Sequence, residues 1–209
     1  MVTGSIAAEL PADSDARRRI LEAAYDLFSR RGVRAVGIDE VVRRAEVAKA
    51  TLYRHFPSKD ELAVAFLQER EERWTREWLE AEARRRGSTP EERLLAIFDV
   101  FDGWFHETDF EGCSFINVLA EDSDRENAVA LACATHLENI RGILRRFAAE
   151  AGIEDVDDFA RTWHILMKGS IVSAMEGDAE AAQRAKNVGR LVLAHFRRAA
   201  PPGGGALPG

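Results

Sequence analysis

Residues 47–62 of the chain read Val-Ala-Lys-Ala-Thr-Leu-Tyr-Arg-His-Phe-Pro-Ser-Lys-Asp-Glu-Leu. A helix that begins at Lys49 cannot continue past Phe56, because Pro57 keeps the residue before it out of the helical region. Leu52 and Phe56 are four positions apart and share one face of this helix. The other side presents basic, hydroxyl and aromatic groups, and such a helix is slim enough to enter a DNA major groove about 12 Å wide.

Two further helices precede this one. Apolar residues recur at helical spacing over residues 20–31, and Gly32 supplies the stop. The same spacing returns over residues 38–45, where Asp39 and Glu40 occupy the first turn that the helix dipole favours for acidic groups. Three short helices with an exposed polar third helix are typical of a helix-turn-helix domain. A small helical bundle with a solvated charged face has the same spacing and charge, and it stays open at this point.

The charge is divided unevenly along the chain. The net charge is -7, yet residues 14–59 hold 11 Lys and Arg against 6 Asp and Glu, a balance of +5, and the remainder is at -12. Phosphate binding depends on local basic surface rather than on the overall charge. The basic segment therefore remains a candidate for DNA, and the acidic part is expected to do something else.

Composition excludes several classes of protein. The chain has 209 residues, 46% of them hydrophobic, and no apolar run reaches the roughly 20 residues of a membrane span. No secretory signal is visible, so we expect a cytoplasmic protein without membrane contact. Cys113 and Cys133 form no CxxC motif, and the histidines have no metal-ligand spacing, so we expect neither metal nor cofactor. Nucleophile-elbow and phosphate-loop motifs are missing, so an enzyme is the weaker alternative.

Residues 14–62 resemble the DNA-binding domain of the tetracycline-repressor (TetR) family. The resemblance rests on Arg19-Ile20-Leu21 through Phe28, on Gly32, on residues 38–45 and above all on residues 47–62. It implies that Lys49, Thr51, Tyr53 and His55 face DNA and that Lys59 touches the backbone. The DNA-binding positions that we expect in full are Gly37, Ile38, Lys49, Ala50, Thr51, Tyr53, Arg54, His55 and Lys59.

Three positions depart from the family pattern. Gly37 stands where Ser or Thr usually caps the second helix, and Ala48 replaces a common Ser. Glu46 occupies a turn position that is commonly Gly, and a left-handed conformation there would cost about 1 kcal/mol. These changes bear on local stability and on phosphate contacts, while the fold is expected to be unaffected.

The rest of the chain predicts an all-α fold. Ser58 and Glu61 form a capping box for a connector helix that runs to Arg86, about 40 Å long at 1.5 Å per residue. Helical patterns follow over residues 94–106, 115–121, 125–151, 156–174 and 181–196, and no alternating strand pattern lies between them. We expect a disordered arm over residues 1–13, a helix-turn-helix domain over 14–60, a helical effector-binding and dimerisation domain over 61–200, and a disordered tail over 201–209.

Aromatic residues are concentrated in the acidic part. The resemblance implies a pocket for a small effector, apolar or cationic because indole faces attract cations and the domain is acidic. Ordinary core packing is the competing interpretation for any one of these residues. The candidate pocket residues are Trp74, Trp78, Phe98, Phe101, Trp104, Phe105, Phe115, His136, Trp163 and Met167.

The last two helices are expected to pair with those of a second copy. The family implies a four-helix dimer interface, and a purely internal hairpin is the alternative. The candidate interface residues are Phe159, Trp163, Ser170, Ala174, Val188, Leu191, Val192 and Phe196.

Together these features predict a homodimeric transcriptional repressor. It would leave a palindromic double-stranded operator when a small-molecule effector binds. The alternatives are an activator of the same fold and an effector-binding adaptor whose DNA-binding domain no longer functions.

Overall fold

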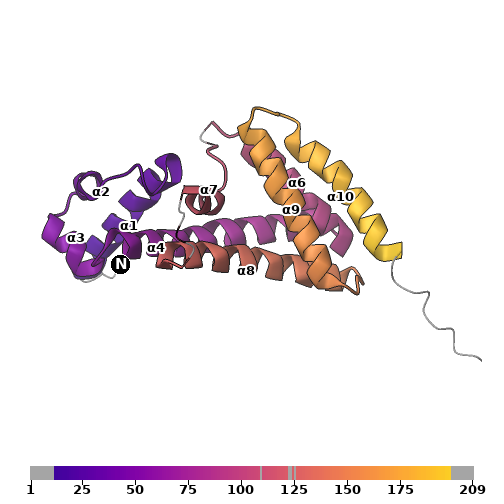
Figure 1. Cartoon of the computed structure of the whole chain (residues 1–209), viewed down its shortest axis with the longest axis horizontal. Helices are drawn as coiled ribbons and strands as arrows, with labels where there is room; N and C mark the ends of the chain where they lie inside the picture. The colour runs from indigo at the N-terminus through magenta and orange to yellow at the C-terminus, as the bar shows by residue number, and fades with distance from the viewer. Residues whose placement is uncertain (1–11, 109, 122–123, 125, 199–209) are drawn as a thin grey trace, which may run out of the picture.

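The computed structural model describes residues 12–108, 110–121, 124 and 126–198, in which helices are joined by turns and loops and there is no strand (Figure 1). The all-α prediction is therefore confirmed. No helix within those ranges is both long enough and apolar enough to cross a bilayer. Helices begin or end within a few residues of the predicted positions, except that α1 (Ala12–Arg31) begins inside the arm expected over residues 1–13. Residues 1–11 and the tail expected over 201–209 lie outside the described residues.

The first three helices form a compact unit at one end of the molecule (Figure 1). Helix α1 packs against α2 (Ile38–Ala45) and α3 (Lys49–His55). Their apolar faces close one core, in which Ile20, Val41 and Leu52 are fully buried and Phe28 and Phe56 nearly so. The spacing of these residues agrees with helices, since Ile20 and Phe28 are eight positions apart and Leu52 and Phe56 are four apart.

A long connector leads from this unit into the rest of the molecule. It consists of α4 (Lys59–Arg70), η1 (Glu71–Glu80) and α5 (Ala81–Arg86), which follow one another without a break in helical backbone. The Ser58 hydroxyl accepts a hydrogen bond from the Glu61 amide at 3.1 Å, as the predicted cap requires. The middle ten residues form a π-helix instead of the α-helix that the sequence predicts. π-Helical turns are rare and are often found at functional sites.

The second part is a bundle built on this connector. It contains α6 (Pro90–Phe105), α7 (Ser114–Glu121), α8 (Ala128–Glu150), α9 (Val156–Met175) and α10 (Ala181–Arg198). A capping box of Thr89 and Glu92, which the sequence analysis did not identify, starts α6. Helix α10 packs against both α6 and α9. Its close approach depends on Gly189, where a Cβ would lie 2.9 Å from Cη2 of Trp163.

Candidate nucleic-acid interface and ligand cleft

The outward face of α3 is held in position by the two residues on its inward face. Leu52 is fully buried and Phe56 is 3% exposed. The guanidinium carbon of Arg17 in α1 lies over the Phe56 ring, 5.0 Å from its centroid. Since the middle and the C-terminal end of α3 are fixed in this way, its opposite side is directed away from the core, at the tip of the molecule (Figure 1).

The nine predicted DNA-binding residues lie on or beside this tip. Those on the outer side of α3 are exposed, and the Tyr53 ring is 41% exposed. Thr51 and His55 flank that side and are partly buried. The Lys59 ammonium donates a hydrogen bond to the backbone oxygen of Arg34 at 3.4 Å, which links α4 to the loop before α2. The exposed residues are Gly37, Lys49, Ala50, Tyr53 and Arg54, and Ile38 and Lys59 are partly buried.

The turn between α2 and α3 has the strained conformation that the sequence suggested. Glu46 ends α2 at φ 53° and ψ 47°, and it is the only described residue other than glycine with positive φ. The Arg19 guanidinium donates hydrogen bonds to the backbone oxygens of Ala45 at 3.2 Å and Glu46 at 3.4 Å. These bonds satisfy carbonyls at the end of α2 and hold the turn against α1. Gly37 caps the start of α2 in an extended conformation without a side-chain bond.

A carboxylate on α2 neutralises one of the expected DNA contacts. The Lys49 ammonium lies 2.8 Å from a carboxylate oxygen of Asp39, whose side chain is 82% exposed. The hydrogen bond from Lys49 to this carboxylate is the main reason why the pKa of Lys49 is raised. A DNA phosphate must therefore compete with Asp39 for Lys49. The sequence analysis related Asp39 only to the helix dipole and missed this contact.

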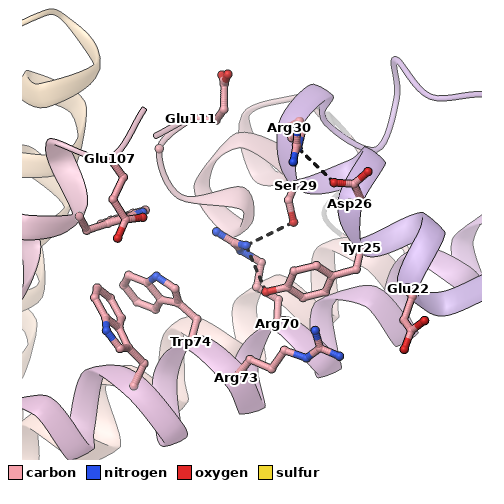
Figure 2. A pocket seen from close by; sticks show the side chains of 13 residues that line it. Glu22, Tyr25, Asp26, Ser29, Arg30, Arg70, Arg73, Trp74, Glu107 and Glu111 are labelled. Carbon is pink, nitrogen blue, oxygen red and sulfur yellow. Dashed lines mark hydrogen bonds and ion pairs between the residues drawn. The ribbon is translucent and has the colours of Figure 1, made fainter. Parts of the chain in front are cut away.

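The candidate pocket residues fall into two groups. Trp74, Trp78 and Trp104 line a cleft of about 460 Å³, which is the size of a small-molecule site (Figure 2). The cleft also has walls that the sequence analysis did not include, because Tyr25 and Ser29 of α1 line it. It therefore lies between the N-terminal unit and the bundle.

The other candidate pocket residues belong to the packed interior. They form contacts with one another, such as the Phe98 and Trp163 rings, whose centroids are 5.4 Å apart. The apolar gap beside Met167 measures about 10 Å³. Phe105 is partly buried, and the buried ones are Phe98, Phe101, Phe115, His136, Trp163 and Met167.

Two buried histidines are held in the neutral form. The His136 ring stacks on Phe115 with 3.2 Å between ring centroids, and neither ring nitrogen has a hydrogen-bond partner, since a carboxylate oxygen of Glu71 lies 3.7 Å from Nδ1. Burial, with smaller contributions from the charges of His164 and Arg70, lowers the pKa of His136 to about 3. Burial and the neighbouring Lys168 and Arg141 lower the pKa of His164 to about 3 as well. No group of His, Cys, Asp and Glu within the described residues is arranged to hold a metal ion.

The candidate interface residues are also divided between surface and interior. On α10, Val188 is 45% and Leu191 is 71% exposed. On α9, Phe159, Trp163 and Ser170 point into the bundle and are at most 5% exposed, so they offer no surface to a second copy. The large apolar residues exposed on α9 are instead Ile165, Val172 and Met175, at 67%, 43% and 49%, and none of them was predicted as an interface residue. Ala174, Val192 and Phe196 are partly buried.

Two family models match the chain. Residues 20–66 match a model described as bacterial regulatory proteins, tetR family, and residues 90–188 match one described as tetracyclin repressor-like, C-terminal domain. The first match covers α2, α3, most of α1 and the first part of α4, and the second covers α6 to α9 and the first part of α10.

Individual proteins are similar as well. The transcriptional activator FasR of Mycolicibacterium smegmatis is 49% identical over 59 residues, which are 28% of this chain and 26% of FasR. The transcriptional repressor KstR of the same species is 41% identical over 86 residues, 40% of each protein. The chain thus aligns with less than half the length of these relatives.

A solved structure extends the similarity to almost the whole chain. It is a TetR-family transcriptional regulator from Streptomyces coelicolor, with a TM-score of 0.78 and 29% identity over 88% of this chain and 96% of that one. Sequence and architecture agree in both parts of the molecule, and we conclude that the chain belongs to the TetR family of bacterial regulatory proteins.

Proposed function

We propose that the chain is a DNA-binding transcriptional repressor that acts as a homodimer and responds to a small molecule. The observation that carries the proposal is the outer side of α3, where Lys49, Tyr53 and Arg54 project from a helix whose other side is buried. In helix-turn-helix proteins such a helix enters the major groove, its basic and hydroxyl groups bind phosphates, and its other polar groups contact base edges.

Two copies are needed to read two half-sites, and α9 and α10 offer the surface for pairing. Ile165, Val172, Val188 and Leu191 are large apolar residues left exposed on these two helices. Helices α9 and α10 lie at the opposite end of the molecule from α3 (Figure 1). A two-fold axis beside them would direct two α3 helices outward, as a palindromic operator with half-sites about one helical turn or more apart requires.

The DNA-binding step is tested by selecting bound fragments from random genomic DNA and measuring their affinity by gel shift over a salt series. Lys49→Ala and Tyr53→Ala should abolish the specific shift while the far-ultraviolet spectrum stays helical. Arg190→Ala is the matched control, because it removes one exposed positive charge from α10 and should leave the specific shift unchanged. Sequence-independent binding at moderate salt, or full binding by both variants, would contradict the assignment.

Dimerisation is tested by sedimentation equilibrium. Leu191→Arg places a charge on the most exposed apolar residue of α10 and should produce monomers. Leu131→Arg is the control, because Leu131 is 54% exposed but lies on α8, outside the proposed interface. A wild-type chain that is monomeric at micromolar concentration, or dissociation by both variants alike, would contradict the interface.

The effector response follows from linkage. A ligand that binds better to the DNA-free arrangement of the dimer lowers operator affinity, and the operator lowers ligand affinity by the same factor. FasR is named an activator and KstR a repressor. A reporter gene under the native promoter therefore tests whether the chain represses or activates transcription. If the chain is a repressor, deletion of its gene should raise expression of the reporter. A fall in expression would support an activator, and ligand binding without any operator binding would support an adaptor.

A further inference from the structure

The cleft between α1 and the connector is built from both parts of the molecule. Its lining includes Tyr25 and Ser29 of α1, Arg70 at the end of α4, Trp74 of η1 and Trp104 of α6. Figure 2 shows these walls facing one another, with the loop that follows α6 on the far side. A molecule bound here would touch the DNA-reading unit and the bundle at once.

Among the three arginines that line the cleft, Arg70 is the one without a carboxylate partner, since Arg30 lies 3.1 Å from Asp26 and Arg73 is paired with Glu69. Its Nη1 donates hydrogen bonds to the Ser29 hydroxyl at 3.2 Å and the Tyr25 hydroxyl at 3.4 Å, both neutral acceptors (Figure 2). No carboxylate among the described residues lies within 4.0 Å of its guanidinium, although Arg70 is partly buried. An arginine has five donor N–H groups in a planar fork, and the strongest acceptor for that fork is a carboxylate.

The neighbouring arginine provides a direct contrast. Arg73 also lines the cleft, but its guanidinium lies 2.6 Å from a carboxylate oxygen of Glu69. Its charge is compensated within the connector. The uncompensated positive charge of the cleft is therefore that of Arg70, one helical turn from the aromatic wall.

The aromatic wall determines the shape of the ligand. The Trp74 and Trp104 rings are 4.9 Å apart at 63°, and Trp78 lies 5.4 Å from Trp74. Inclined indole faces of this kind accommodate a flat apolar body. Glu107 and Glu111 stand exposed on the rim, without hydrogen-bond or ion-pair partners for their carboxylates among the described residues. Their charge repels ligands with a second anionic group at that end.

We propose that this cleft binds a flat aromatic monocarboxylate, with its carboxylate on Arg70 and its ring system against Trp74 and Trp104. This proposal names the chemical class of the effector and its binding site. It rests on the proposed function, because the ligand acts as an effector only if the chain is a ligand-responsive regulator. The acidic composition also suggested a cationic effector. Such a ligand would be repelled by the positive charge of Arg70 unless it bound only at the rim of the cleft.

The experiment uses naphthalene-2-carboxylate as the probe and titration calorimetry on the full chain at pH 7.5 without DNA. We expect one site per chain with submillimolar affinity. Arg70→Gln should weaken binding at least about 10-fold, because a charge-assisted contact is lost, and Arg73→Gln less than about 2-fold. Naphthalen-2-ylmethylammonium, which has a similar shape and the opposite charge, should bind at least about 10-fold more weakly than the carboxylate.

A second measurement uses the unaltered protein, in case Arg70→Gln does not fold. Phenylglyoxal modification followed by mass spectrometry should show that the carboxylate protects Arg70 and leaves the reactivity of Arg73 unchanged. Tighter binding of the ammonium probe, equal protection of both arginines, or no binding of the carboxylate at millimolar concentration would each overturn the proposal. A chain that binds the probe but no operator would refute the proposed function alone, and the converse result would refute this site alone.

Discussion

Acidification should destabilise this protein before its carboxylates become protonated, because His136 and His164 are buried in the neutral form. The pKa of each is lowered from 6.5 to about 3 in the folded chain, chiefly by burial. Between these two values the unfolded chain binds protons that the folded chain does not bind. The contribution of the two histidines is therefore fully present above about pH 6.5 and is lost as the pH falls toward 3.

The magnitude follows from the two pKa values. Each histidine lowers the free energy of unfolding by about 1.4 kcal/mol per pH unit below pH 6.5. From pH 7.5 to 5.0 the loss is about 2 kcal/mol for one histidine and about 4 kcal/mol for both, a large part of a typical total of about 5–15 kcal/mol. Carboxylates with a lowered pKa, such as Glu82 at about 2 beside Arg85 and Arg86, stay ionised over this interval.

The assay is guanidinium unfolding followed by tryptophan fluorescence at a fixed protomer concentration, since dimerisation contributes to apparent stability. His136→Phe keeps an aromatic ring against Phe115 and removes one proton acceptor, so it should halve the loss. His106→Gln alters an exposed histidine, so the free energy of unfolding of this variant should fall by as much as that of the wild type between pH 7.5 and 5.0. An unchanged loss in His136→Phe, or no loss in the wild type, would refute the reasoning.

Three further substitutions test local features. Asp39→Asn frees Lys49 from its ion pair, so gel shifts should show tighter duplex binding and a salt dependence steeper by about one unit; an unchanged slope would contradict a role for that pair. Glu46→Gly relieves the left-handed turn and should raise the free energy of unfolding by about 1 kcal/mol in the same denaturant assay, whereas a decrease would contradict strain there. Gly189→Ala should cost about 1–3 kcal/mol because its methyl group meets the tryptophan of α9, while Gly103→Ala, with open space around it, should cost no stability.

The N-terminal unit was predictable because its signals are local. Pro57 ends α3, Ser58 caps α4, and Leu52 with Phe56 sets the inward face of α3, all within a few residues of one another. Even the strain at Glu46 could be expected from the residue type. The contact between Asp39 and Lys49 could not, because it depends on how two helices are placed relative to each other in space.

The π-helical segment of the connector could not be predicted from spacing. Trp74 and Trp78 are four positions apart, and that interval places two side chains on similar sides of an α-helix and of the wider π-helix alike. The sequence contains neither Pro nor Gly in residues 71–80 to mark a change. The Trp74 ring packs against Trp104, which lies in another helix, and the local spacing of the residues does not show a contact of that kind.

The outward side of α9 was assigned to the wrong stripe for a related reason. The helix carries one apolar stripe through Phe159 and Trp163 and a second through Ile165 and Val172. Both have helical spacing, and the family resemblance on which the interface prediction rested does not distinguish between them. Because α6, α8 and α10 all pack against α9, the aromatic stripe is enclosed within the protomer and the second stripe is left exposed.

Arg70 lies where the proposed ligand site contacts both α1 and the connector. On one side Arg70 bonds to hydroxyls of α1, and four residues further along the connector Trp74 packs against Trp104 of the bundle. One helical turn therefore carries the contacts of both parts of the molecule. A carboxylate that takes the Arg70 donors competes with the α1 hydroxyls, while a ring against Trp74 acts on the bundle. In the proposed dimer such a ligand would alter the orientation of α1 relative to the two-fold axis. Because α1 and α3 share one core, the separation of the two α3 helices would then change as well.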